Sequence, residues 1–145
     1  MSQETPGSVL VCVTVQPSCH RLIVAGKSLA EQYGVPLRVV SVLPKRLVSH
    51  KTADALQTLY NISGKLGAEM TVFFNDEVAL TVAVHARQSD VIHLVSGMPE
   101  ADSNAFVETI RELLPDIPLS LVDQDGQMVT FPALVSSVSP SQKRD

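Results

Sequence analysis

The chain has 145 residues, of which 45% are hydrophobic and 18% are charged, and this balance is typical of one globular domain with a core of its own. A formal net charge of −4 argues against nucleic acid as a partner, since phosphate binding requires a clustered Lys and Arg surface. No apolar run reaches the length of a membrane span, and the first residues lack the basic and apolar parts of a signal peptide. We therefore expect a cytoplasmic protein without a nucleic-acid or membrane partner.

Apolar runs typical of strands alternate with helical patterns along the chain. In chain order, strands are expected at residues 9–15, 37–43, 69–74, 90–95 and 119–122. The helices between them are expected to begin with N-caps at Ser18, at Ser49, at Asn75 or Asp76, and at Asp102 or Ser103. The first two helices are expected to end at Gly34 and Gly67.

This alternation predicts an α/β fold. Strands joined by helices imply right-handed crossovers and a parallel sheet between helical layers. Five such strands favour a three-layer α/β/α, flavodoxin-like (Rossmann-like) architecture with the strand order 3-2-1-4-5, whose ligand crevice lies at the carboxyl ends of strands 1 and 4. We expect one domain at residues 8–135, a disordered N-terminus at 1–7 and a flexible tail at 136–145.

The C-terminal part of this domain adds one element to the parallel sheet. Asp125-Gly126 is a turn signal, and residues 128–131 are expected to return as an extra antiparallel strand. A hairpin at this position would cover the exposed edge of strand 5, either within one subunit or across a dimer. We therefore expect a homodimer that forms through strand 5 and the hairpin.

Several segments carry a resemblance to a known family. They are residues 9–18 (Val-Leu-Val-Cys-Val-Thr-Val-Gln-Pro-Ser), Arg21-Leu22-Ile23, residues 37–42, Leu66-Gly67-Ala68-Glu69, Asp76-Glu77-Val78-Ala79 and Pro115-Asp116-Ile117-Pro118. Together they resemble the universal stress protein family over residues 9–122, and are most similar to the domain carried by osmosensing potassium sensor kinases. The resemblance implies a dimeric α/β domain from one of two branches. One branch binds ATP through Gly-x2-Gly-x9-Gly-Ser/Thr after strand 4, and the other lacks these glycines and acts through protein contacts.

The chain departs from the ATP-binding branch. In that branch an Asp ends strand 1, whereas this chain has Thr14. With Gly97 as the first motif glycine, the next two glycine positions hold Glu100 and Ile110, and the Ser/Thr position holds Arg111. A phosphate cradle needs backbone N–H groups that no Cβ atom obstructs, and a nearby carboxylate would repel a triphosphate. We therefore expect a domain without ATP or another cofactor, which acts in stress response or signalling through dimerisation and contacts with an unidentified protein.

A small-molecule sensor is the alternative function. Some sensor-kinase relatives are associated with cyclic dinucleotides, through Ser-x-Ser at the end of strand 1 and an aromatic-rich strand 2. Here Thr14-Val15-Gln16 keeps hydrogen-bonding groups, but residues 37–41 contain no Phe or Tyr to stack on a base. A sensor of nucleotides or cyclic dinucleotides would use the crevice at the carboxyl ends of strands 1 and 4. Its ligand-binding residues would be Thr14, Gln16, Val42 and Gly97.

Metal binding and catalysis find little support in the sequence. The four histidines do not have the spacing that is typical of metal ligands: His20, His50, His85 and His93. Cys12 in a strand and Cys19 in the first turn of a helix are not expected to form a disulfide, although a thiol at a helix N-terminus can take a redox role. No Gly-x-Ser-x-Gly turn marks a nucleophile, and Asp76 lacks the acidic partner at the end of strand 1 that a phosphoacceptor needs. We expect neither a metal site nor an enzymatic activity.

Overall fold

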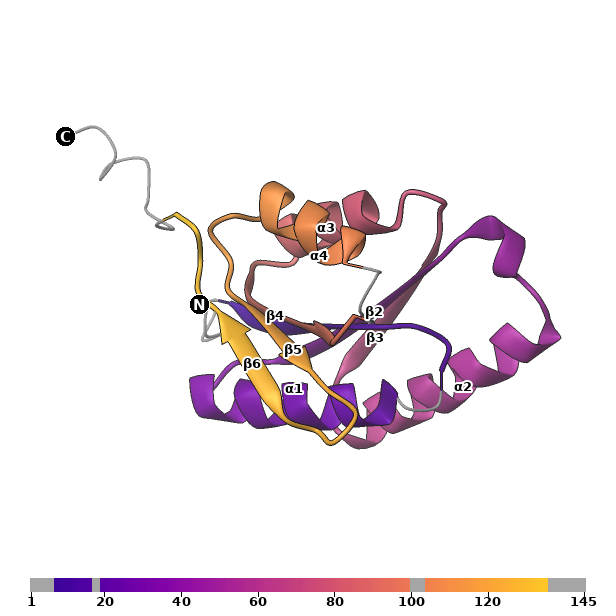
Figure 1. The fold of residues 1–145 in the computed structure, drawn as a ribbon. Helices are drawn as coiled ribbons and strands as arrows, with labels where there is room; N and C mark the ends of the chain where they lie inside the picture. Colours follow the sequence, from indigo (N-terminus) through magenta and orange to yellow (C-terminus); the bar gives the residue numbers. More distant parts are fainter. Residues whose placement is uncertain (1–6, 17–18, 100–103, 136–145) are drawn as a thin grey trace.

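The described part of the structure, a computed structural model, comprises residues 7–16, 19–99 and 104–135, so the expected disordered ends lie outside it apart from Gly7. A six-stranded sheet runs through it in the order β3-β2-β1-β4-β5-β6 (Figure 1). The strands are β1 Ser8–Val13, β2 Leu37–Leu43, β3 Glu69–Phe74, β4 Val91–Gly97, β5 Leu119–Val122 and β6 Met128–Phe131. The helices are α1 His20–Tyr33, α2 His50–Lys65, α3 Val78–Gln88 and α4 Ala105–Leu113, with a 3-10 turn η2 at Lys45–Leu47. Strands β1 to β5 are parallel and β6 is antiparallel to β5, so the predicted fold, strand order and extra strand are confirmed.

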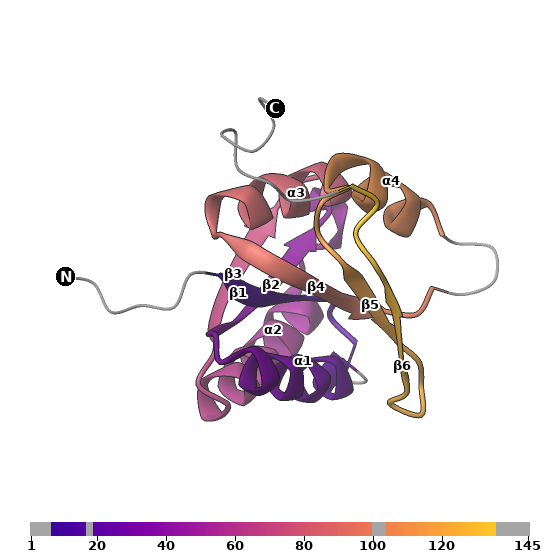
Figure 2. The same cartoon turned by 90° about the vertical axis from the view of Figure 1, so that its left-hand side faces the viewer.

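Helices cover both faces of this sheet. Helices α1 and α2 lie on one face, and α3 and α4 lie on the other (Figures 1 and 2). Successive strand residues point to opposite faces, so β1 sends Val9 and Val11 toward α1, and Leu10 and Cys12 toward α3 and α4. All four side chains are buried, as the near-continuous apolar run predicts. Within the described residues, no helix combines the length and apolar character needed to cross a membrane.

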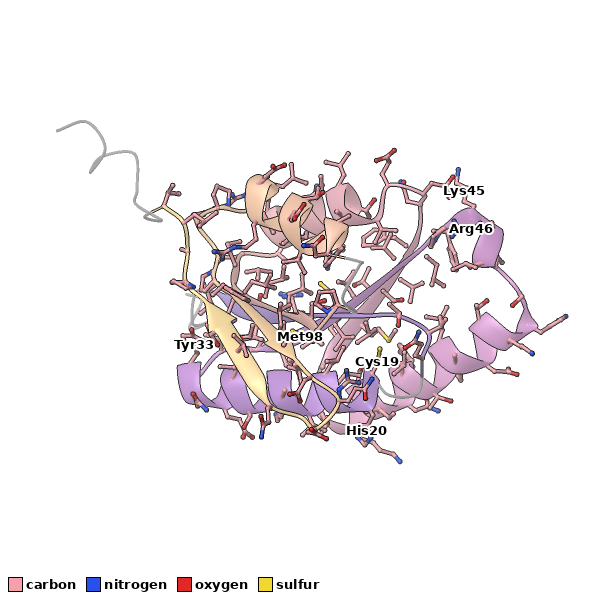
Figure 3. The ribbon with its side chains drawn as sticks, viewed as in Figure 1. Cys19, His20, Tyr33, Lys45, Arg46 and Met98 are labelled. Atoms are coloured by element: carbon pink, nitrogen blue, oxygen red, sulfur yellow. The ribbon has the colours of Figure 1, made fainter. Side chains whose placement is uncertain are left out.

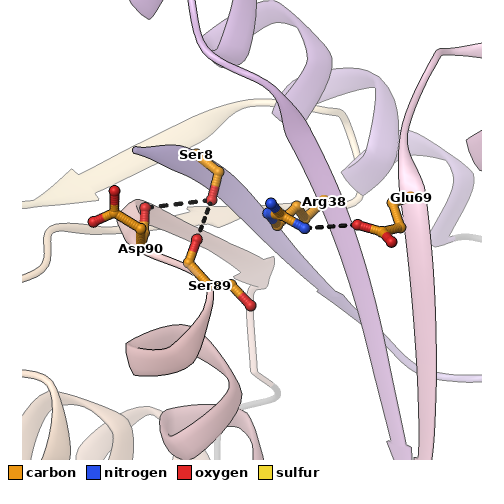
Figure 4. Close-up of polar contacts among 5 residues, drawn as sticks. All are labelled: Ser8, Arg38, Glu69, Ser89 and Asp90. Carbon is orange, nitrogen blue, oxygen red and sulfur yellow. Dashed lines mark hydrogen bonds and ion pairs between the residues drawn. The ribbon is translucent and has the colours of Figure 1, made fainter. Parts of the chain in front are cut away.

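Most strand boundaries agree with the sequence, but β1 ends at Val13 where Val15 was predicted, and β4 begins and ends later than predicted. Asp90, predicted as its first residue, has a left-handed φ of 55° and therefore belongs to the preceding turn. Three hydrogen bonds tie this turn to the start of β1. The Gly7 N–H donates to the Asp90 carboxylate at 3.0 Å. The Ser8 hydroxyl lies within hydrogen-bond distance of the Ser89 carbonyl at 3.2 Å and of the Asp90 carbonyl at 3.5 Å (Figure 4).

Helix α2 begins at its predicted cap. The Thr52 N–H donates to Ser49 Oγ at 3.3 Å, and the Ser49 N–H donates to Thr52 Oγ1 at 2.8 Å, which makes a reciprocal capping box. Gly34 ends α1 with a φ of 72°, and Gly67 follows α2 with a φ of 77°. Both glycines therefore adopt the left-handed conformation that their positions predict.

The predicted cap of α3 is wrong. The N-cap is Glu77, and neither Asn75 nor Asp76 takes that position. Asn75 Oδ1 accepts the Glu77 N–H at 2.8 Å in a local turn. Asp76 Oδ1 instead accepts the Lys45 N–H at 2.9 Å and joins the loop after β3 to η2. These two hydrogen bonds engage the side-chain oxygens of Asn75 and Asp76, and the helix begins after Glu77.

Two other predicted caps lie next to described helices. Helix α1 has Cys19 as its N-cap, and α4 has Asn104. The residues predicted for these roles, Ser18 and Asp102 or Ser103, lie outside the described part of the chain.

The C-terminal hairpin closes the sheet edge within the same chain. Gly126 has a φ of 83°, and Asp123 Oδ1 accepts the N–H groups of Asp125 and Gln127, each at 2.9 Å. The Asp-Gly turn therefore forms as predicted. Of the two arrangements that the sequence left open, the structure has the hairpin that covers β5 of its own subunit.

A chain of side-chain hydrogen bonds links α1 to this hairpin. Tyr33, near the end of α1, places its hydroxyl 2.8 Å from His93 Nδ1 (Figure 3). His93 Nε2 lies 2.7 Å from Ser120 Oγ, which in turn lies 2.7 Å from Thr130 Oγ1. A neutral imidazole supplies one donor and one acceptor, and hydroxyl groups complement both. Burial lowers the pKa of His93, so the fold favours this neutral form.

Two helical glycines predict opposite effects of one substitution. At Gly26, a Cβ would overlap the Val11 side chain and lie 3.1 Å from Leu37 Cδ1. We expect Gly26→Ala to lower the free energy of unfolding by about 1–3 kcal/mol through overpacking. At Gly64 no atom lies within 4 Å of such a Cβ, and Gly64→Ala is expected to raise stability by about 0.5–1 kcal/mol. Urea unfolding measures both, and equal effects would contradict this packing of α1 on β1.

The buried histidine predicts a loss of stability in mild acid. The pKa of His93 is lowered in the folded state, so the unfolded chain binds the proton more readily. The stabilising contribution is therefore present above the unfolded pKa, near 6.5, and is lost as the pH falls below it. We expect the pH dependence of the urea midpoint between pH 7.5 and 5 to be shallower in His93→Gln. His20→Gln is the control because its side chain is exposed, and an equal flattening in both variants would exclude His93 as the cause.

Candidate functional site

A pocket of about 300 Å³ opens at the carboxyl ends of β1, β2 and β4, on the face that α3 and α4 cover. Strand alternation directs side chains of these strands toward that face, and the two helices supply the opposite wall. The lining residues are Cys12, Val13, Thr14, Val40, Val42, Val78, Val82, Ser96, Gly97, Pro99, Phe106 and Val107. The crevice that the strand order predicts therefore exists as a cavity.

The pocket brings together three of the four predicted ligand-binding residues. Thr14 at the end of β1, Val42 in β2 and Gly97 at the end of β4 all line it. Gln16 does not line it and is exposed beyond the end of β1. The strand ends at Val13, and of the residues after it only Thr14 among Thr14, Val15 and Gln16 lines the pocket.

Sequence reasoning missed most of the wall. Cys12 and Ser96 point to the α3 and α4 face by strand alternation, a signal that the sequence carries. Val78 and Phe106 come from the two helices, whose inward faces the sequence interprets only as core. The aromatic residue of the wall is Phe106 of α4, whereas the resemblance to sensor-kinase relatives places the aromatic residues in the second strand.

The two hydroxyl groups of the wall, those of Thr14 and Ser96, differ in their hydrogen bonding. The Thr14 hydroxyl lies 3.4 Å from Cys19 Sγ, which also accepts the Thr14 N–H at 3.3 Å. Ser96 is 8% exposed, and its side chain has no hydrogen-bond partner within the described residues. Ser96 therefore offers a free hydroxyl to the pocket.

The backbone after β4 offers few donors. The Met98 N–H donates to the Val122 carbonyl at 2.9 Å, which continues the β4–β5 pairing. Pro99 has no N–H group. Neither Met98 nor Pro99 therefore presents a free N–H to an anion, which is the group that a phosphate loop supplies.

Cationic side chains near this end of the sheet are engaged or distant. Arg21, on the first turn of α1, donates from Nε to the Asp123 carbonyl at 2.6 Å and does not line the pocket. Figure 3 shows Lys45 and Arg46 on the exposed turn beyond β2, well away from Met98. The twelve described lining residues include no Lys, Arg or His.

The cysteines and histidines do not gather into a reactive cluster. Cys12 and Cys19 are free and pack in separate cores on opposite faces of the sheet. Burial raises the pKa of the Cys12 thiol to about 12, so this group stays neutral at pH 7. Among the described residues, no group of three or more His, Cys, Asp or Glu side chains is placed to hold a metal ion.

No protein-family model and no curated protein matches this chain. Solved structures do match in fold, among them the universal stress protein from Archaeoglobus fulgidus, with a TM-score of 0.59 and 20% identity over 73% of this chain and 86% of that one. A universal stress protein from Archaeoglobus fulgidus in complex with dAMP has a TM-score of 0.58 and 19% identity over 79% of this chain and 95% of that one. A universal stress protein in complex with cAMP has a TM-score of 0.58 and 12% identity over 75% of this chain and 90% of that one. The 4-carboxy-2-hydroxymuconate hydratase GalB from Pseudomonas putida KT2440 has a TM-score of 0.59 and 12% identity over 79% of this chain and 65% of that one.

These comparisons define a fold. At 20% identity or less, the likeness shows that the chain has the universal-stress-protein-like α/β fold. The same architecture occurs in an enzyme at equal structural similarity, so the fold alone does not select a function. Function has to be argued from the residues of the pocket and the surface.

The raised pKa of Cys12 predicts slow alkylation. We expect iodoacetamide to modify Cys12 in the folded protein at pH 8 about a thousandfold more slowly than in urea, since a pKa of about 12 in place of 9.0 lowers the thiolate fraction by that factor. Mass spectrometry of a Cys19→Ser variant isolates the reaction of Cys12. Labelling within tenfold of the unfolded rate would contradict a neutral, buried thiol.

Proposed function

We propose that this chain is a universal-stress-protein-like domain that does not bind ATP and acts in stress response or signalling through dimerisation and protein contacts. The backbone after β4 is the observation that supports this proposal. The Met98 N–H is paired with Val122, Pro99 has none, and the sequence continues with Glu100 and Asp102. Met98 and Pro99 therefore offer a triphosphate no free N–H, and the carboxylates of the following sequence would repel it.

The wall of the pocket also supports a function without catalysis. Its polar side chains are the thiol of Cys12 and the hydroxyls of Thr14 and Ser96, and the described wall contains no His, Asp, Glu or Lys to act as a general base. A hydroxyl nucleophile needs such a base within hydrogen-bond reach. The proposal is therefore a binding domain.

An exposed apolar surface beside β6 supports contacts with protein. The outer edge of β6 has no strand partner in the described chain, and Val129 and Phe131 on this strand are 47% and 39% exposed. Arg111 of α4 lies over the Phe131 ring at 5.6 Å. The Leu134 N–H donates to the Pro115 carbonyl at 2.6 Å. This hydrogen bond holds Leu134, a further exposed apolar residue, beside the segment that follows α4. We call this surface, formed by Leu113, Val129, Phe131, Leu134 and Val135, the β6 surface.

A second copy of this chain is the partner proposed for the β6 surface. Because β6 occupies the edge of β5, the expected dimer forms through the hairpin, with the outer edge of β6 facing its counterpart. An unpaired strand edge is self-complementary in the antiparallel orientation, since its N–H and C=O groups alternate. The exposed apolar side chains of this edge would be buried in the same contact.

A small-molecule sensor is the second candidate, and the pocket favours it. A cavity of about 300 Å³ at the predicted crevice lies at the lower end of the usual size of ligand sites. Universal stress proteins of this fold have been solved with dAMP and with cAMP, so adenine nucleotides are the first compounds to test.

Native mass spectrometry of the purified chain tests both candidates. We expect a dimer without a bound nucleotide, and a Val129→Glu variant that dimerises at least about tenfold more weakly, because the new charges would face each other across the twofold contact. Val84→Glu on α3 is the matched control, since Val84 is also 47% exposed. A monomeric wild type, or equal effects of the two variants, would contradict the dimer. A co-purified adenine nucleotide or cyclic dinucleotide would contradict the first candidate and favour the sensor.

A further inference from the structure

The pocket at the carboxyl ends of β1, β2 and β4 is predominantly apolar. Nine of its twelve described lining residues are hydrophobic or proline, and the others are Thr14, Ser96 and Gly97. Branched valines supply walls from both strands and helices, and Phe106 adds an aromatic side chain. Such a wall gains free energy by covering apolar ligand surface, by about 25 cal/mol for each Å² removed from water.

Charge in a ligand would be unfavourable at this wall. The described wall has no ionised side chain, because the Cys12 thiol is neutral and Arg21, which binds the end of β5, is not one of the lining residues. The Met98 N–H is already paired. Desolvating an anion or a cation without a partner costs several kcal/mol or more. The wall therefore selects against the phosphate group of a nucleotide as well as against a fixed positive charge.

One polar group of the wall is available to orient a ligand. The Thr14 hydroxyl is engaged with Cys19, whereas the Ser96 hydroxyl has no partner within the described residues and lines the pocket. A hydroxyl can donate one hydrogen bond and can also accept through its oxygen lone pairs. An apolar ligand with one hydroxyl, carbonyl or uncharged aromatic amine group would satisfy it, in the manner of sites whose few polar groups fix orientation.

We propose that this pocket binds an uncharged, mainly apolar small molecule that makes one hydrogen bond to Ser96 and packs against Phe106. The proposal rests on the second candidate function, the small-molecule sensor, and names its class of ligand. It replaces nucleotides with uncharged compounds such as aromatic or aliphatic alcohols and ketones and weakly basic aromatic amines.

Fluorescence titration with N-phenyl-1-naphthylamine, an uncharged apolar probe, tests the proposal on the full chain. We expect saturable binding at micromolar concentration that 1-naphthol and naphthalene displace, and that AMP and ATP do not. Absence of saturable binding would overturn the proposal. Displacement by AMP at a lower concentration than by 1-naphthol would also overturn it.

Variants locate the binding in the pocket. Val78 lines the pocket from α3, and Val78→Phe is expected to fill it and weaken probe binding at least about tenfold. Val84→Phe makes the same change on the exposed side of the same helix and is expected to bind as the wild type does. Circular dichroism confirms that both fold, and Val107→Phe on α4 replaces Val78→Phe if that variant unfolds. Equal binding by the filled and control variants would place the probe elsewhere and overturn the proposal.

Ser96→Ala separates the hydrogen bond from the apolar contact. Loss of one neutral hydrogen bond is expected to weaken 1-naphthol by about three- to tenfold and to leave naphthalene unchanged. Equal effects on the two compounds would remove Ser96 from the proposal. If native mass spectrometry finds a bound nucleotide that naphthalene does not displace, the sensor function holds and the apolar ligand is wrong. If neither nucleotides nor apolar compounds bind, both the sensor function and the apolar ligand are wrong. The proposed dimer is tested separately by Val129→Glu and Val84→Glu.

Discussion

The burial of β1 on both faces is the constraint on which the rest of the fold depends. Val9, Leu10 and Val11 are fully buried, so helices have to cover each side of this central strand. On one side α1 approaches so closely that Gly26 has no room for a Cβ beside Val11. On the other side α3 and α4 complete the core around Leu10. The central strand thus determines both the layer order and the close packing of the first helix.

The same arrangement creates the pocket. Strand β1 lies between β2 and β4, and the strand order reverses direction on either side of it. After β1 the chain continues into the helix of one face, and after β4 into the helix of the other, so a gap remains at the carboxyl ends. Topology therefore fixes where the cavity lies. The chemistry of the cavity depends on the residues that a particular sequence places there, here valines, Phe106 and two hydroxyls.

The sequence predicts the elements well because their signals are local. Apolar runs, the Ser49 cap and the Asp125-Gly126 turn each report on a few neighbouring residues, and the structure confirms them. The predicted N-cap of α3 was wrong because the Asp76 carboxylate accepts the N–H of Lys45, 31 positions away in the chain. The pocket wall was found only in part for a similar reason. Phe106 faces the ends of β1 and β4 through tertiary packing, which a single sequence does not display.

The late end of β4 and the absence of a free N–H at Met98 have one cause. The hydrogen bond from the Met98 N–H to the Val122 carbonyl extends the pairing of β4 with β5 beyond the predicted end of the strand. The same bond consumes the donor that a phosphate loop would need at its first turn, and Pro99 removes the next one. Arg21 binds the carbonyl of Asp123, so the end of β5 is fixed by a second contact. The end of β4 is therefore held by its pairing with β5, and the proposed uncharged ligand needs no free N–H from this segment.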